Sequence, residues 1–200
     1  MNPPSSCIFW CAAGALRCIE LAASDIPALQ RFFEANPAYF ESVNGGAPAP
    51  DEAQHEYDDL PPAGMPFERK WLLGFVDENG ELRAMANVLA NFLAPDVWHI
   101  GLFIVASSLQ GRGIASIVYE RLEQWIAGNG ARWIRLGVVA GNGRAERFWH
   151  RAGYLEVRRR HDVVMGERVN TVVVMVKPLA ATDRLSEYLA VVARDRPESS

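Results

Sequence analysis

Two kinds of hydrophobic spacing divide the chain into predicted strands and helices. Residues 97–105 form a nearly continuous apolar run, which is typical of a strand buried on both faces of a sheet. Apolar residues in 114–126 recur instead at offsets of 0, 3, 4, 8, 11 and 12, so they form one stripe of a helix. The same reasoning predicts strands over 16–21, 71–76, 82–89, 133–139, 154–162 and 169–177, helices over 27–33, 142–152 and 181–194, and a turn or short helix over 37–44.

Turn residues connect these elements and mark one long loop. The Asn79-Gly80 pair is a strong hairpin signal, so the strands on either side of it are expected to be antiparallel. Residues 45–66 are predicted to be a loop that contains no basic residue. Its acids either form a solvated surface or act as a lid that attracts a cation. They are Asp51, Glu52, Glu56, Asp58 and Asp59.

The order of elements predicts one mixed α/β domain without internal repeats. We expect this domain to cover 16–178, with an N-terminal extension over 1–15 and a C-terminal helical tail over 179–200. A chain of 200 residues that is 50% hydrophobic and 22% charged can bury one substantial core. The longest apolar stretch without a formal charge, 97–109, has 13 residues, whereas a membrane span needs about 20. No membrane association is therefore expected.

Charge and cysteine usage exclude further classes of protein. The net charge of −4 provides no cationic field for a phosphate backbone, so no nucleic-acid partner is expected. Cys7, Cys11 and Cys18 are odd in number and lack a second cluster of ligands, which argues against a disulfide framework and a metal site. No Lys or Arg precedes the apolar stretch 7–15, as a secretory signal would require. These features favour a cytoplasmic protein.

The turn between the buried strand and the amphipathic helix is the first candidate binding site. Small residues at 111, 113 and 115 let backbone amides approach a ligand, and the first amides of a helix suit an anionic phosphate group. A structural tight turn would have a similar sequence. No P-loop motif occurs, and a Rossmann fingerprint would need Gly where Ser116 stands and an acid where the next strand offers Arg132 and Arg135. A dinucleotide-binding oxidoreductase is therefore a weaker alternative.

Two motifs resemble the GCN5-related N-acetyltransferase (GNAT) family. The first, of the form QxxGxA after a strand valine, consists of Val105, Gln110, Gly113 and Ala115. The second resembles the NxxAxxFYxxxGF region and consists of Asn142, Ala145, Phe148, Trp149, Gly153 and Tyr154. They occur in the family's order at suitable spacing, and with the predicted elements the resemblance covers roughly 16–178.

The resemblance implies a fold, a cosubstrate and a reaction. The implied fold is a mixed, mostly antiparallel sheet, flanked by helices and splayed between the fourth and fifth predicted strands, 97–105 and 133–139. Acetyl-CoA would lie in that wedge, and its acetyl group would pass by direct attack to a primary amine of a small molecule or peptide, without a metal. Backbone groups and side chains carried over as cofactor contacts are Phe103, Ile104, Val105, Gln110, Gly111, Arg112, Gly113, Ile114, Ala115, Ser116, Asn142 and Trp149. Asn142 also suits a helix N-cap.

Catalytic groups are less well defined by the resemblance. His99 lies six residues before Val105 on the same strand, where some members carry a catalytic Glu or His, so it is a candidate base; the alternative is a packed structural histidine. Tyr39 and Glu41 are weaker candidates for substrate contact or base. Trp149 stands where many members have an acidic tyrosine, and an indole N–H donates hydrogen bonds without acting as a phenol-like acid.

The sequence leaves open which amine is the acceptor and whether the protein is an active enzyme. The acidic segment 51–59 would suit a cationic acceptor by charge complementarity. Trp149 favours a rival in which the protein is a catalytically silent CoA-binding module. Members of the family are often dimers, and the apolar run 169–176 either completes the sheet or contacts a partner, so a homodimer is favoured.

Overall fold

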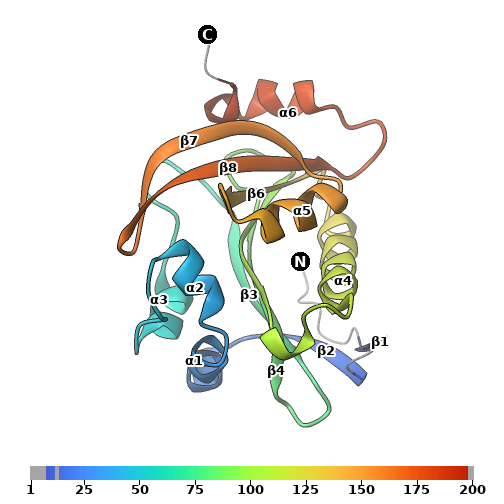
Figure 1. Ribbon diagram of the computed structural model, residues 1–200. Coiled ribbons are helices and arrows are strands. Elements are labelled where there is room, and N and C mark those ends of the chain that lie inside the picture. The colour runs from blue at the N-terminus through green and yellow to red at the C-terminus, as the bar shows by residue number, and fades with distance from the viewer. Residues whose placement is uncertain (1–7, 12–13, 198–200) are drawn as a thin grey trace.

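The computed structural model describes residues 8–11 and 14–197, which build one mixed sheet with helices on both sides (Figure 1). The strand order is β1-β2-β3-β4-β5-β6-β8-β7. All neighbouring strands are antiparallel except β5 and β6, which are parallel. The strands are β1 Ile8–Cys11, β2 Gly14–Glu20, β3 Arg69–Val76, β4 Leu82–Ala90, β5 Val97–Val105, β6 Trp133–Val139, β7 Leu155–Met165 and β8 Arg168–Pro178.

Helices cover the two faces of the sheet unequally. Figure 1 shows α1, α2 and α3 on one side and α4 on the other. Helix α5 packs beside α4 through the rings of Tyr119 and Phe148, and α6 lies against β7 and β8. The helices are α1 Ile26–Glu34, α2 Ala38–Val43, α3 Glu52–Asp58, α4 Ile114–Gly128, α5 Gly143–Arg151 and α6 Leu185–Val191, with 3-10 turns η1 Ala23–Asp25, η2 Ser107–Leu109 and η3 Ala193–Asp195.

Three expectations about the elements need correction. Residues 8–11, in the expected N-terminal extension for which no strand was predicted, form β1, which pairs with β2 at the sheet edge. The expected loop 45–66 contains α3, and the expected terminal helix 181–194 is only α6 followed by η3. Edge pairing and short helices depend on tertiary partners more than on hydrophobic periodicity, which explains why spacing alone missed them.

Helix α3 shows this dependence directly. Gln30 of α1 accepts a hydrogen bond from the Ala53 amide at 2.9 Å, which satisfies a donor of the first turn. At the other end, Lys70 Nζ of β3 donates to the carbonyl oxygens of Glu56 at 2.5 Å and Asp59 at 2.6 Å. Both ends of a seven-residue helix are therefore stabilised by groups far away in the sequence.

Two hydrophobic clusters hold the sheet to its helices. The larger one joins the sheet to α1, α2, α4 and α5 and includes Phe33, Trp71, Trp98, Ile114 and Leu122, all almost inaccessible to solvent. The smaller one joins the sheet to α6 and includes Val97, Trp133, Val174, Val176, Tyr188 and Val192. Buried aromatic and aliphatic groups of this size supply most of the stabilising free energy, at about 25 cal/mol per Å² of apolar surface.

The sheet opens where β5 and β6 part. Their pairing runs only from Val97 and Trp133 to Ile100 and Leu136. Beyond that point β5 remains paired with β4, and β6 remains paired with β8, so the inner edges face each other without backbone hydrogen bonds. A register shift in the β4–β5 ladder leaves Gly101 as an extra residue at the start of the opening. This confirms the splay between the two predicted strands.

Candidate active site

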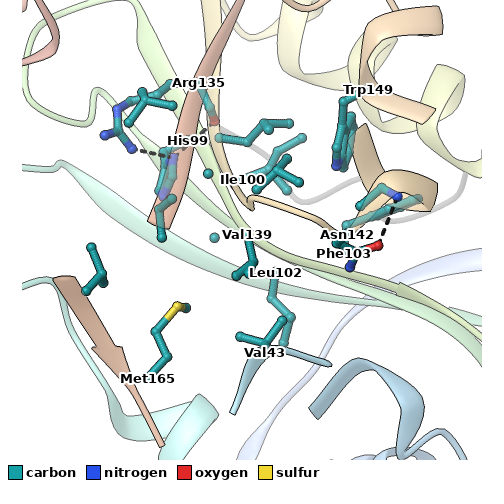
Figure 2. A pocket seen from close by; sticks show the side chains of 18 of the residues that line it. Val43, His99, Ile100, Leu102, Phe103, Arg135, Val139, Asn142, Trp149 and Met165 are labelled. Atoms are coloured by element: carbon teal, nitrogen blue, oxygen red, sulfur yellow. Dashed lines mark hydrogen bonds between the residues drawn. The ribbon is translucent and has the colours of Figure 1, made fainter. Parts of the chain in front are cut away.

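A cavity of about 330 Å³ occupies the opening between β5 and β6. Strand β5 contributes His99 through Phe103, β6 contributes Arg135 through Val139, and α2, α5, β7 and β8 supply the remaining walls. Figure 2 shows Arg135 and His99 at one end, Asn142, Phe103 and Trp149 at the other, and Val43 and Met165 across from Leu102. The predicted residues Tyr39, His99, Phe103, Asn142 and Trp149 therefore meet in one cavity.

The predicted phosphate turn lies outside the cavity lining, at the start of α4. Gly111 and Gly113 have φ angles of +76° and +75°, a left-handed conformation that favours glycine. The Gly113 carbonyl accepts from Ser116 and Ile117, whereas the amides of 111–115 have no acceptor within the described residues. Five free amides at the positive end of a helix of 15 residues form a site for an anion.

Asn142 connects the cavity to α5. Its Oδ1 accepts a hydrogen bond from the Ala145 amide at 3.2 Å, so it caps the helix while lining the cavity (Figure 2). Two residues later, Arg144 donates to the side-chain oxygen of Gln110, which joins the start of α5 to the turn before α4. The two predicted motifs are thus in contact.

Trp149 belongs to an aromatic cluster. Its ring is 5.7 Å from Phe103, 5.2 Å from Tyr119 and 5.2 Å from Tyr154, and the side chain is only 8% exposed. The hydroxyls of Tyr119 and Tyr154 are hydrogen-bonded to each other at 3.0 Å, and burial raises the pKa of both. Neither tyrosine lines the cavity, whereas Trp149 and Phe103 do.

His99 is held as a neutral imidazole. Its Nδ1 lies 3.0 Å from the carbonyl oxygen of Arg135, and its ring stacks on Phe92 with centroids 4.7 Å apart. Burial, the larger cause, and the charge of Arg135 together lower the pKa of His99 to about 3. A group with this pKa accepts hydrogen bonds at neutral pH but has little tendency to take a proton.

Arg135 and Arg160 form a buried ionic group that sequence reasoning missed. Asp195, fully buried in η3, accepts from Arg135 Nε at 2.7 Å and from Arg160 Nη2 at 2.9 Å. Tyr188 of α6 donates to the same carboxylate at 2.5 Å. The partners are up to 60 residues apart, and no local pattern marks such pairs in the sequence.

The acceptor residues expected from α2 and the acidic segment are only partly at the cavity. Tyr39 lines it, and burial beside Glu56 raises the pKa of its hydroxyl, whereas Glu41 is exposed and does not line it. None of the five acids of 51–59 lines the cavity. Glu56 accepts instead from Asn87 Nδ2 at 2.5 Å, and burial raises the pKa of its carboxyl.

Sequence and structure comparisons relate the chain to known proteins. Residues 29–154 match the acetyltransferase (GNAT) family, which is more than half of the chain. The chain belongs to this family. No curated protein matches it.

Solved GNAT structures share the fold at low sequence identity. A spermidine N-acetyltransferase from Vibrio cholerae, in complex with CoA and spermine, aligns with a TM-score of 0.61 and 17% identity, over 82% of this chain and 95% of that one. A GCN5-related N-acetyltransferase from Kribbella flavida gives 0.59 and 23% over 82% and 97%. An acetyltransferase from Thermus thermophilus gives 0.59 and 22% over 82% and 96%.

Within residues 8–11 and 14–197, no helix is both long and apolar enough to cross a membrane. Over the same residues, His, Cys, Asp and Glu side chains form no group of three or more that could hold a metal ion.

Proposed function

We propose that the protein transfers the acetyl group of acetyl-CoA to a primary amine of a small molecule or peptide by direct attack. The observation that carries this proposal is the cavity where β5 and β6 part, together with the free amides in the turn that connects β5 to α4. A strand edge without partners can pair with an amide-rich ligand, and the helix N-terminus can bind phosphate. We assign this role to the domain formed by 16–178.

The cofactor contacts follow from these two features. Phe103, Ile104 and Val105 continue β5 beyond its pairing with β6, so their backbone would hold the acetyl and pantetheine parts. The free amides of 111–115 would hold the pyrophosphate, whereas the amides of Gln110 and Ser116, also expected to take part, already donate to the carbonyls of Ser107 and Gly113. Asn142 and Trp149, which line the cavity from α5, would contact the pantetheine arm.

In the reaction, the neutral amine nitrogen forms a bond to the acetyl carbon, the carbon–sulfur bond breaks, and CoA leaves as a thiolate. The amine must lose a proton, which His99 would receive poorly because its pKa is about 3. We therefore assign His99 the role of a hydrogen-bond acceptor that orients the amine, with the proton passing to solvent. The indole N–H of Trp149 could donate a hydrogen bond to the departing sulfur but could not protonate it.

Ligand-induced stabilisation tests the cofactor. A ligand that binds only the folded state raises its stability by RT ln(1 + [L]/Kd), so acetyl-CoA and CoA should raise Tm in a concentration-dependent way, and NADH should not. CoA release with a panel of amines then tests transfer. Stabilisation by NADH but not CoA, or by none of them at millimolar concentration, would contradict the proposal.

A catalytically silent CoA-binding module is a second candidate. Two observations favour it: Trp149 stands where many relatives have tyrosine, and His99 is a weak base. Turnover of any amine excludes this candidate, whereas CoA binding alone does not. We also expect a cytoplasmic homodimer, for which sedimentation measures the oligomeric state.

A further inference from the structure

The charged groups that line the cavity are of one sign. Among the described lining residues these are Arg135 and Arg160, and no Asp or Glu is present. His99, next to Arg135, adds no charge at neutral pH because its pKa is low. The end of the cavity formed by β6 and β7 is therefore basic.

Asp195 balances only part of this charge. It accepts from Arg135 at 2.7 and 3.2 Å, from Arg160 at 2.9 Å and from the Tyr188 hydroxyl at 2.5 Å, so its oxygens are already occupied. It stays ionised, because the hydrogen bonds and charge of Arg135 lower its pKa to about 2 against the effect of burial. One carboxylate facing two guanidinium groups leaves one positive charge in this group of three.

Arg160 also has unused donors. Its hydrogen bonds within the described residues all come from Nη2, to Asp195 and to the carbonyl oxygen of Arg194, and its buried Nε has no partner. Burial and the charges of Arg160 and Arg135 lower the pKa of the neighbouring Arg194. A bound anion would relieve this repulsion and accept from the free donors.

The rest of this part of the cavity is apolar. Val43 of α2, Leu102 of β5, Val163 and Met165 of β7 and Val172 of β8 line it. His99, which pairs in register with Arg135, is two residues before Gly101, a separation of about 7 Å along a strand. The basic end thus lies within the length of a small molecule from the opening where the acetyl group would be transferred.

We propose that the acceptor is an α-amino acid with an apolar side chain, whose carboxylate binds to Arg160 and Arg135 while its amine faces the thioester. This rests on the proposed acetyl transfer and names its substrate class. Guanidinium groups bind carboxylates through paired hydrogen bonds, and the apolar walls contact the side chain. The product would be an N-acetyl amino acid. A polycation, which the acidic segment suggested, would meet no carboxylate in the cavity.

Matched acceptors test the carboxylate. Leucine, leucinamide, isoamylamine, glycine and spermidine are compared by CoA release at fixed acetyl-CoA. Leucine should have at least about tenfold higher kcat/KM than leucinamide and isoamylamine, which lack the carboxylate, and should exceed glycine, which has no side chain to bury. Equal or better turnover of isoamylamine or spermidine would overturn the proposal.

A pair of variants tests the residue. Arg160→Gln should raise the KM for leucine about tenfold or more and bring leucine close to isoamylamine, with the KM for acetyl-CoA unchanged. Arg159→Gln is the control, because Arg159 points to the other face of β7, is exposed and pairs with Glu156 at 2.7 Å. Arg159→Gln removes the same charge and should keep the wild-type preference for leucine over isoamylamine. An equal loss in both variants would contradict a specific role for Arg160.

Thermal shift separates this inference from the proposed function. With CoA present, leucine should raise the Tm of the wild-type protein but not that of Arg160→Gln, while CoA alone should stabilise both and so show that the variant folds. If no amine is turned over, transfer fails as a function, and a leucine-specific shift still supports the carboxylate site. Absence of that shift in the wild type, whether or not transfer occurs, overturns the site.

Discussion

The surroundings of single residues determine what the site can do. His99 has an ordinary side chain for acid–base chemistry, yet burial against Phe92 and the charge of Arg135 keep it neutral. Trp149 takes a position associated with tyrosine in many relatives and packs into an aromatic cluster that includes two buried tyrosines. For His99 the neighbours decide the chemistry, whereas for Trp149 the indole itself limits it to hydrogen bonding.

The low pKa of His99 predicts a pH-dependent stability. In the folded protein the pKa of His99 is about 3, so the imidazole stays neutral until the pH approaches that value. In the unfolded chain His99 takes up its proton near the ordinary pKa of 6.5. The contribution of neutral His99 is therefore fully present above pH 6.5 and is lost as the pH falls toward 3. Urea unfolding at about pH 7 and about pH 5 should show a smaller pH effect in His99→Gln than in the wild type. His150→Gln, at an exposed position of α5, should retain the wild-type effect.

At the scale of elements, the turn before α4 joins a strand, a loop and a helix at the place where we propose phosphate binding. Its geometry depends on two glycines with positive φ and on a helix whose apolar stripe packs in the core. By contrast, α3 is held at both ends by Gln30 and Lys70. The acidic side chains of this helix therefore sit on a fixed element, and none of them lines the cavity.

Two glycine substitutions on α4 separate backbone strain from helix propensity. Gly113→Ala places a side chain at φ +75°, so it should destabilise the protein by about 1–2 kcal/mol and reduce the Tm shift caused by CoA. Gly128→Ala, at the other end of α4 in open space and without positive φ, should stabilise by about 0.5–1 kcal/mol and leave the CoA shift unchanged. Similar losses of CoA binding in both would argue against phosphate binding at the turn.

At the scale of the whole molecule, the C-terminal segment supports the candidate site without lining its cavity. Helix α6 packs its buried Tyr188 against Trp133 of β6, and Asp195 reaches the two arginines that line the cavity. The end of the chain therefore supports the basic wall from behind.

Removing the carboxylate of Asp195 should test this support. Asp195→Asn leaves two buried or half-buried guanidinium groups without their common counterion, and we expect a loss of about 3–5 kcal/mol in the free energy of unfolding. Asp183→Asn is a useful comparison, because Asp183 pairs with the more exposed Arg132 at 3.0 Å and should cost about 1 kcal/mol or less. Chemical denaturation measures both, and equal losses would contradict a special role for Asp195.

Local features of the sequence determined much of the fold and part of the site. The apolar run 97–105, the helical stripe 114–126 and the Asn79-Gly80 turn depend on residues close in the chain, and the structure has the strand, the helix and the hairpin that they predict. The family motifs likewise indicated the splay between β5 and β6, and Asn142 as a cap of α5 followed from its position before that helix.

Only the tertiary structure decided the rest, because the relevant partners lie far apart in sequence. No periodic signal in the sequence marks the pairing of Arg135 and Arg160 with Asp195. The same holds for the position of α3 against β3 and β4 and for the pairing of β1 with β2. Burial, which keeps His99 neutral, is also a property of the assembled core. Sequence therefore defined most of the elements and the glycine turn before α4, whereas packing between distant segments set the charge and polarity of the cavity.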